Sequence, residues 1–298
     1  MPLPPKMPVD PEILEPLVAL FDDRDTVVTD LVDQRLASFG TEVVRSLHNR
    51  AERESDPVQK AAIIERARRL NATFRLDEFQ DFINRSPAPL SLFEGGWFIS
   101  SLFDWTLSRE RYEALFYACL EAYQVEHSDM RTGVENIRIL NHVFYRRLKF
   151  TLYDVQLKDP QHAFLSDALH SREGNPFVLA YIYLAICQSA GLSVELLCFP
   201  GGFVPAYVEN GRILFYINIY RGGELFPQDR LEGFLKATGL QIDHSAFRRR
   251  DESSMLTLYL ESLLYIHAGL KDEKKSALIE RALDMLGPER FLAIDAPE

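Results

Sequence analysis

Hydrophobic residues recur at helical spacing along most of the chain, whereas a region near residues 194–219 alternates apolar and polar positions instead. Over residues 10–71 the helical spacing predicts four short helices, in the stretches DPEILEPLVALFDD, TVVTDLVDQRLASFG, TEVVRSLHNRAE and DPVQKAAIIERARRLN. In the second stretch we assign Leu31, Leu36 and Phe39 to one apolar face. The Asp-Pro pairs favour helix starts, because aspartate caps a helix and proline fits its first turn.

These antiparallel helices resemble HEAT-type repeats, which implies a helical lobe over residues 1–72 that contacts other proteins. Helical spacing continues through a connector over residues 73–130. Near the end of the chain, over residues 239–298, two predicted helices joined around Gly269 resemble a tetratricopeptide-type hairpin. The basic run at 248–250 precedes this pair, and the two acidic residues that follow it indicate a solvated helix start.

The alternating region predicts three antiparallel strands, Val194–Phe199, Phe203–Val208 and Ile213–Ile219. Asn-Gly at positions 210–211 favours a tight hairpin turn between the second and third strands, because both residue types tolerate positive φ. Pro205 lacks a backbone N–H, which predicts an edge position or a bulge for the second strand.

Before these strands lies the stretch GNPFVLAYIYLAICQSAGL, which predicts a buried helix with Asn175 as its N-cap and Pro176 in its first turn. The expected fold class is therefore α+β, mostly helical, with a central helix packed on a small antiparallel sheet. In cysteine acyl-transfer enzymes the nucleophile lies at such a helix N-terminus, where backbone N–H groups lower the thiol pKa and stabilise an oxyanion. The residues at this helix start are consequently the first candidates for chemistry.

The region from residue 131 to residue 235 resembles the bacterial SirB-type transglutaminase-like family. The motifs that carry the resemblance occur in order and at matching spacing: Asp159-Pro160, Phe164-Leu165, Gly174-Asn175-Pro176, Gly191-Leu192, Pro200-Gly201 and Gly222-Gly223. The resemblance implies a transglutaminase-like (papain-like) core over residues 131–238, flanked by the HEAT-like and tetratricopeptide-like helices.

The resemblance also implies where a catalytic triad would lie. The cysteine position falls on Pro176, the histidine position on Gly202 and the aspartate position on Asn218, so the three positions contain no thiol, imidazole or carboxylate. No histidine occurs between His170 and His244, which leaves the predicted strands without an imidazole base. We therefore expect an inert helix start and no enzymatic activity.

The leading hypothesis is a non-catalytic binding or scaffold module. Its expected contact surface is a vestigial cleft between the helix start and the strands, which Gly202 would open, with these candidate residues: Asn175, Pro176, Gly202, Tyr216 and Asn218. The alternative is a thiol-dependent acyl transferase or cysteine hydrolase with a relocated nucleophile at Cys198, which requires a nearby histidine. A third hypothesis is an adaptor that acts only through its N-terminal lobe.

The amino-acid composition and net charge limit the kinds of partner that the protein is expected to bind. The chain of 298 residues has a formal net charge of -11, which argues against nucleic acid and anionic membranes as partners. Three cysteines, Cys119, Cys187 and Cys198, lie in apolar runs, as in reduced cytoplasmic proteins. The first residues lack the apolar core of a signal peptide. Because no metal-ligand or nucleotide-binding motif occurs, we expect no metal or cofactor. We also expect a cytoplasmic location and a protein or peptide partner.

Overall fold

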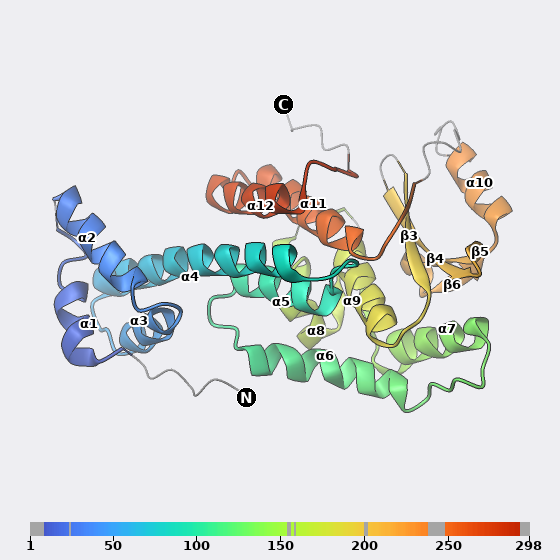
Figure 1. Ribbon diagram of the computed structural model, residues 1–298, viewed down its shortest axis with the longest axis horizontal. Coiled ribbons are helices and arrows are strands. Elements are labelled where there is room, and N and C mark those ends of the chain that lie inside the picture. The colour runs from blue at the N-terminus through green and yellow to red at the C-terminus, as the bar shows by residue number, and fades with distance from the viewer. Residues whose placement is uncertain are drawn as a thin grey trace. The chain divides into compact units, whose positions relative to one another are not determined.

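The computed structural model describes most of the chain (Figure 1). The described residues are 9–23, 25–153, 156–157, 159–199, 202–237 and 248–292. Two compact units divide the chain. Unit 1 comprises Met1–Asp81 with Ser101–Ser108, and unit 2 comprises Phe82–Ser100 with Arg109–Glu298.

Unit 1 is built from helices, as the apolar spacing predicts. Its elements are α1 (Pro11–Val18), α2 (Thr26–Ala37), α3 (Glu42–Glu52) and most of α4 (Pro57–Arg85). Asp10 and Asp25 cap the first two helices through their side chains, which accept hydrogen bonds from the N–H groups of Glu12 and Val27.

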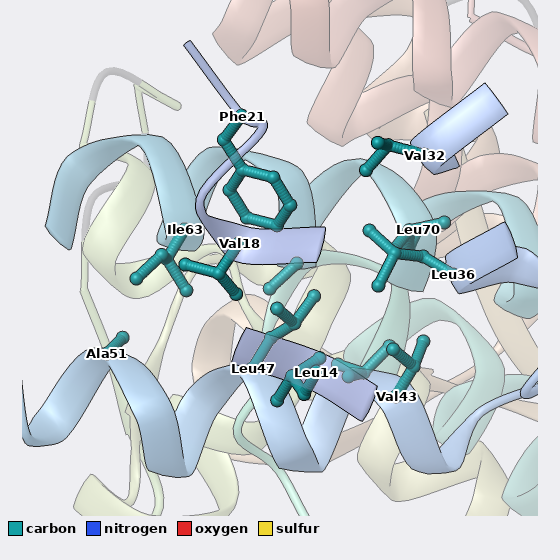
Figure 2. Close-up of a cluster of buried hydrophobic side chains, with 12 residues drawn as sticks. Leu14, Val18, Phe21, Val32, Leu36, Val43, Leu47, Ala51, Ile63 and Leu70 are labelled. Atoms are coloured by element: carbon teal, nitrogen blue, oxygen red, sulfur yellow. The ribbon is translucent and has the colours of Figure 1, made fainter. Parts of the chain in front are cut away.

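One face of each helix contributes to the core of unit 1. Figure 2 labels ten of its side chains: Leu14, Val18, Phe21, Val32, Leu36, Val43, Leu47, Ala51, Ile63 and Leu70. The prediction that Leu31 shares the buried face with Leu36 is wrong, since Leu31 is 59% exposed and Leu36 is fully buried. Five residues of an α-helix turn the side chain by roughly 140°, so these two leucines lie on different sides of α2.

The predicted helix end near Asn71 is also wrong, because α4 continues without a break to Arg85. The predicted boundary between residues 72 and 73 therefore falls inside a helix. Asn71 is buried, and its side-chain amide donates a hydrogen bond of 2.8 Å to the carbonyl of Ser101. Its polar side chain has a tertiary partner and does not end the helix.

Unit 2 combines helices with a sheet. Its helical elements are the part of α5 (Leu92–Phe103) up to Ser100, α6 (Arg109–Gln124), α7 (Gly133–Asn141), the π-helix η1 (His142–Arg147), α8 (Leu165–Ser171), α9 (Pro176–Ser189), α10 (Gln228–Ala237), α11 (Ser254–Gly269) and α12 (Glu273–Leu286). The helix α9 is the centre of this unit, in contact with α6, α8, α11 and the sheet (Figure 1). The α+β fold class is thereby confirmed.

Among the described residues, five strands form the main sheet in the order β6-β5-β4-β3-β7, with antiparallel pairing throughout. Their bounds are β3 (Val194–Phe199), β4 (Gly202–Glu209), β5 (Arg212–Asn218), β6 (Glu224–Phe226) and β7 (Arg248–Arg250). The three predicted strands and the hairpin are confirmed. At the turn, Asn210 and Gly211 both adopt positive φ, 51° and 75°.

The basic run Arg248–Arg250 is an edge strand paired with β3, so its prediction as a helix start is wrong. Arg249 explains the difference, because its guanidinium donates two hydrogen bonds, of 2.7 and 2.6 Å, to the carboxylate of Glu195 on β3. Arg250 forms an ion pair of 2.8 Å with Glu289. Acidic partners distant in sequence thus stabilise the run as a strand.

The segment after α12 is attached to α11 by a buried carboxylate. Glu261 is 1% exposed, and its side chain accepts hydrogen bonds of 3.0 Å from the backbone N–H groups of Phe291 and Leu292. Burial raises the pKa of Glu261. The two N–H groups compensate part of the cost of burying this polar group.

The prediction that Pro205 places its strand at a sheet edge or beside a bulge is correct only in part. The strand β4 lies inside the sheet, between β3 and β5, so the edge alternative is wrong. Pro205 pairs with Leu196 of β3, whereas the register with β5 begins at Ala206. A register shift between Tyr207 and Val208 provides a bulge close to the proline.

Four helices of unit 2 meet closely at Gly96 in α5. A Cβ atom at this position would lie 2.4 Å from the Tyr112 hydroxyl of α6, 2.7 Å from the Leu165 side chain of α8 and 3.0 Å from the Tyr181 ring of α9. Only glycine permits this approach without displacement of a neighbour.

We expect Gly96→Ala to lower the free energy of unfolding by about 1–3 kcal/mol through overpacking. Gly233→Ala in α10 is the matched control, because no atom lies within 4 Å of a Cβ there. That control should raise stability by up to about 1 kcal/mol, since alanine is the better helix former. Urea unfolding of both variants measures the difference, and equal effects would contradict the close packing at Gly96.

Candidate functional site

The start of α9 is closed by its own cap. Asn175 is fully buried, and its side-chain oxygen accepts hydrogen bonds of 3.0 Å from the N–H groups of Phe177 and Val178. Pro176, also buried, occupies the first helical position and has no N–H to offer. The predicted N-cap is confirmed, and Asn175 itself satisfies two of the free N–H groups of this helix start.

Strand pairing and hydrogen bonds hold the segment before α9 in place. Strand β1 (Thr151–Leu152) pairs in parallel with β2 (Glu173–Gly174), directly before the cap. The backbone N–H of Asn175 donates a hydrogen bond of 2.8 Å to the carbonyl of His162. The hydroxyl of Tyr259 on α11 also contacts this segment, because it accepts a hydrogen bond from the N–H of Leu165 and donates one to the carbonyl of Ala163.

A pocket of about 510 Å³ opens at one end of the sheet. It is lined by Phe199, Gly202, Phe203, Val204, Pro205, Ile217, Asn218, Ile219, Tyr220, Arg221, Glu224, Phe226, Arg230 and Leu231. These residues come from β3, β4, β5, the 3₁₀ turn η3 (Ile219–Arg221), β6 and the first turn of α10. The pocket brings together two of the sequence-predicted site residues, Gly202 and Asn218.

Tyr216 lies beside the pocket and does not line it. Its side chain is 4% exposed and stacks on Phe226, with ring centroids 5.6 Å apart. It belongs to a hydrophobic cluster with Val204, Ala206 and Leu231 of α10. Burial raises the pKa of this tyrosine. The stacking on Phe226 and the contacts within the cluster give Tyr216 a role in packing.

Asn175 and Pro176 do not line the pocket either. The helix α9 packs on the sheet through Phe177, whose ring centroid lies 5.2 Å from that of Phe203. Neighbouring residues of a strand point to opposite faces, and Val204 packs with Leu231 of α10. Most of the pocket therefore belongs to the α10 side of the sheet, away from the start of α9.

Gly202 is covered by an aromatic ring. A Cβ atom at Gly202 would lie 2.7 Å from the ring of Phe199, its cross-strand partner at the end of β3. A larger side chain here would have to displace that ring. Pro200 and Gly201, which connect these two strands, lie outside the described residues.

Hydrogen bonds fix the turn that forms one wall of the pocket. The side-chain amide of Asn141 donates a hydrogen bond of 2.6 Å to the carbonyl of Gly223, and its oxygen accepts one of 2.8 Å from the Tyr183 hydroxyl of α9. The N–H of Gly223 donates to the carbonyl of Asn218. The residues between Asn218 and Gly223 are thus tied to both α7 and α9.

Charged side chains form part of the pocket wall. Arg230 forms an ion pair of 2.9 Å with Glu224, and Arg221 approaches the same carboxylate at 4.0 Å. Sequence reasoning missed both arginines, because they lie in segments that only the folded sheet and α10 bring together. The sequence feature that indicated a turn at this part of the pocket wall was the Gly222-Gly223 pair, which follows Arg221.

Cys198 does not resemble an activated nucleophile. The residue is 4% exposed, does not line the pocket, and burial raises the pKa of its thiol to about 12. Within the described part of the chain, no hydrogen bond joins its sulfur to an imidazole. Cys119 and Cys187 are also buried, and burial raises the pKa of both thiols.

In the described ranges, no group of three or more His, Cys, Asp and Glu side chains is arranged to hold a metal ion. No helix of the described chain is both long enough and apolar enough to span a bilayer.

The first turn of α9 packs on the antiparallel sheet through Phe177 and Phe203, and a helix N-terminus of this kind is a place where a cysteine thiol becomes reactive. The sequence profile of the transglutaminase-like superfamily matches residues 110–260, about half of the chain, and the chain belongs to this superfamily. The UPF0162 proteins of Xylella fastidiosa strains Temecula1 and 9a5c are similar to it, each 25% identical over 136 residues.

That alignment covers 42% of this chain and 47% of each relative, so the chain spans about half the length of the curated relatives it matches. No solved structure gives a significant match.

Proposed function

We propose that this protein is a SirB-type member of the superfamily that binds a protein or peptide and does not catalyse acyl transfer. One observation carries the proposal: the sheet pocket is lined by Gly202 and Asn218, two positions at which the resemblance implies catalytic residues. Neither residue offers an imidazole or a carboxylate. The third position, Pro176, is buried and has no nucleophile.

The chemistry of the start of α9 supports the same conclusion. An acyl-transfer site needs a nucleophile, a base and free N–H donors for an oxyanion. Here Asn175 occupies two N–H groups of the first turn, and proline removes another. What remains at the sheet is a concave surface suited to binding.

We further propose that the helical regions before and after the core make contacts of their own with partners in the cytoplasm. Residues 1–72 would act as a HEAT-like lobe and residues 239–298 as a tetratricopeptide-like hairpin. The contacts between α11 and α12 are compatible with such a hairpin.

Photo-crosslinking tests the binding role. Tyr220, at the pocket and 49% exposed, is replaced by a benzophenone amino acid, and Tyr265, on α11 and 46% exposed, serves as the matched control. We expect one discrete crosslinked protein or peptide for position 220 and none for position 265. Equal crosslinking at both positions would remove the support for a pocket-specific partner.

An enzyme assay tests the other half of the proposal. Acyl transfer and peptide hydrolysis are measured for the natural protein and for Cys198→Ala, the variant that removes the alternative nucleophile. We expect both to remain at the uncatalysed background rate. Turnover by the natural protein that is lost in Cys198→Ala would establish the thiol-dependent alternative instead.

A further inference from the structure

The pocket beside η3 has an apolar floor. The side chains that form it are Phe199, Val204, Phe226 and Leu231, which line the pocket and belong to one hydrophobic cluster on the α10 side of the sheet. Its volume of about 510 Å³ lies within the range of roughly 300–1,000 Å³ found for ligand-binding pockets. A large aliphatic or aromatic side chain is the group that such a surface buries most favourably.

The charged wall of the pocket has an excess of positive charge. Two guanidinium groups, of Arg221 and Arg230, share one carboxylate, that of Glu224. This local excess contrasts with the formal net charge of -11 for the whole chain.

The two arginines differ in how far they are engaged. Arg230 is within hydrogen-bond distance of Glu224, at 2.9 Å. The contact of Arg221 with the same carboxylate is 4.0 Å, longer than a hydrogen bond, and its side chain is 69% exposed. A guanidinium has five N–H donors, arranged in a fork that suits a carboxylate. The exposed guanidinium of Arg221 can therefore donate to a carboxylate of a ligand.

Two polar side chains complete the pocket. The carboxamide of Asn218 forms no hydrogen bond with another residue in the described ranges, and it offers both a donor and an acceptor. Such a group can pair with the N–H and C=O of one peptide unit. Tyr220 adds a half-exposed ring and a hydroxyl at the edge of the pocket.

We propose that the pocket binds a segment of a partner protein in which a large apolar side chain lies next to a glutamate or aspartate. This inference rests on the proposed binding function and names the chemistry of the partner. The apolar side chain occupies the floor, Asn218 pairs with the backbone of the segment, and Arg221 binds the acidic side chain.

The test uses fluorescein-labelled octapeptides with a central phenylalanine between two glutamates, and matched peptides with glutamines in place of the glutamates. Fluorescence anisotropy measures binding to the full-length protein. We expect the glutamate peptide to bind about threefold to fivefold more tightly than the glutamine peptide, as for one exposed ion pair. Arg221→Gln should reduce the affinity for the glutamate peptide to that for the glutamine peptide, and leave the latter unchanged.

Arg281→Gln, an exposed arginine of α12 outside the pocket, is the control and should bind both peptides like the natural protein. Equal affinity of the two peptides, or full affinity after Arg221→Gln, would refute the acidic specificity. Absence of binding by either peptide would also refute it. The proposed function fails separately, through equal crosslinking at positions 220 and 265.

Discussion

Leu184→Ala is expected to lower the free energy of unfolding of unit 2 by about 2–5 kcal/mol. Leu184 lies in the middle of α9 and is fully buried. Its replacement removes buried apolar surface and leaves a cavity that the surrounding helices and sheet fill only in part.

The two tryptophans allow this loss to be assigned to one unit. Trp97 belongs to unit 2 and Trp105 to unit 1, so Trp105→Phe leaves a single fluorescent reporter in unit 2. Urea unfolding in that background compares Leu184→Ala with Leu214→Ala, whose leucine is 48% exposed. The control should change stability by less than about 1 kcal/mol. Similar losses in both variants would contradict the central position of α9.

Tyr259→Phe is the second large effect that we expect. The Tyr259 hydroxyl, on α11, accepts a hydrogen bond of 2.9 Å from the N–H of Leu165 and donates one of 2.9 Å to the carbonyl of Ala163. All three residues are buried. Loss of the hydroxyl leaves two buried backbone groups without partners, at a cost of about 1–3 kcal/mol for each group.

Tyr265→Phe is the matched control, because Tyr265 lies on the same helix and is 46% exposed. Urea unfolding should show a loss of about 2 kcal/mol or more for Tyr259→Phe, and a change within about 0.5 kcal/mol for Tyr265→Phe. If Tyr259→Phe were as stable as the natural protein, the hydroxyl would not be the group that holds the segment before α9.

Features with local signals were predictable from the sequence. The N-cap at Asn175 depends on a side chain and on N–H groups two and three residues away. The hairpin depends on Asn210 and Gly211, whose positive φ suits a tight turn. The apolar run of α9 predicted a helix buried on all sides, and its residues 176–187 are buried.

Features that depend on distant partners were not predictable. The edge strand β7 forms because Arg249 meets Glu195, 54 residues earlier in the chain. The helix α4 continues past Asn71 because that side chain bonds to Ser101. Neither partner is identifiable from the local sequence.

The candidate site was predicted in part. Gly202 and Asn218 line a pocket together, whereas Asn175 and Pro176 lie elsewhere. The alternation of side chains along a strand explains why the pocket and the start of α9 are separate. Gly202 and Phe203 are neighbours in β4, so they point to opposite faces of the sheet. Arg221 and Arg230 join the pocket only when η3 and α10 are assembled on the sheet.

The central claim is that this transglutaminase-like core has no reactive thiol. The measurement that tests it most directly is the rate at which iodoacetamide modifies Cys198, followed by mass spectrometry of its peptide. The thiolate reacts, and a thiol pKa of about 12 leaves only a minute fraction ionised near neutral pH. The unfolded chain, with a thiol pKa of about 8.5, provides the reference rate.

At about pH 7.5 we expect Cys198 in the native protein to react about a thousandfold more slowly than in the unfolded chain. The native rate should rise about tenfold for each pH unit, because the thiolate fraction does so below the pKa. A native rate equal to or above that of the unfolded chain would mean an activated cysteine, and would contradict the account.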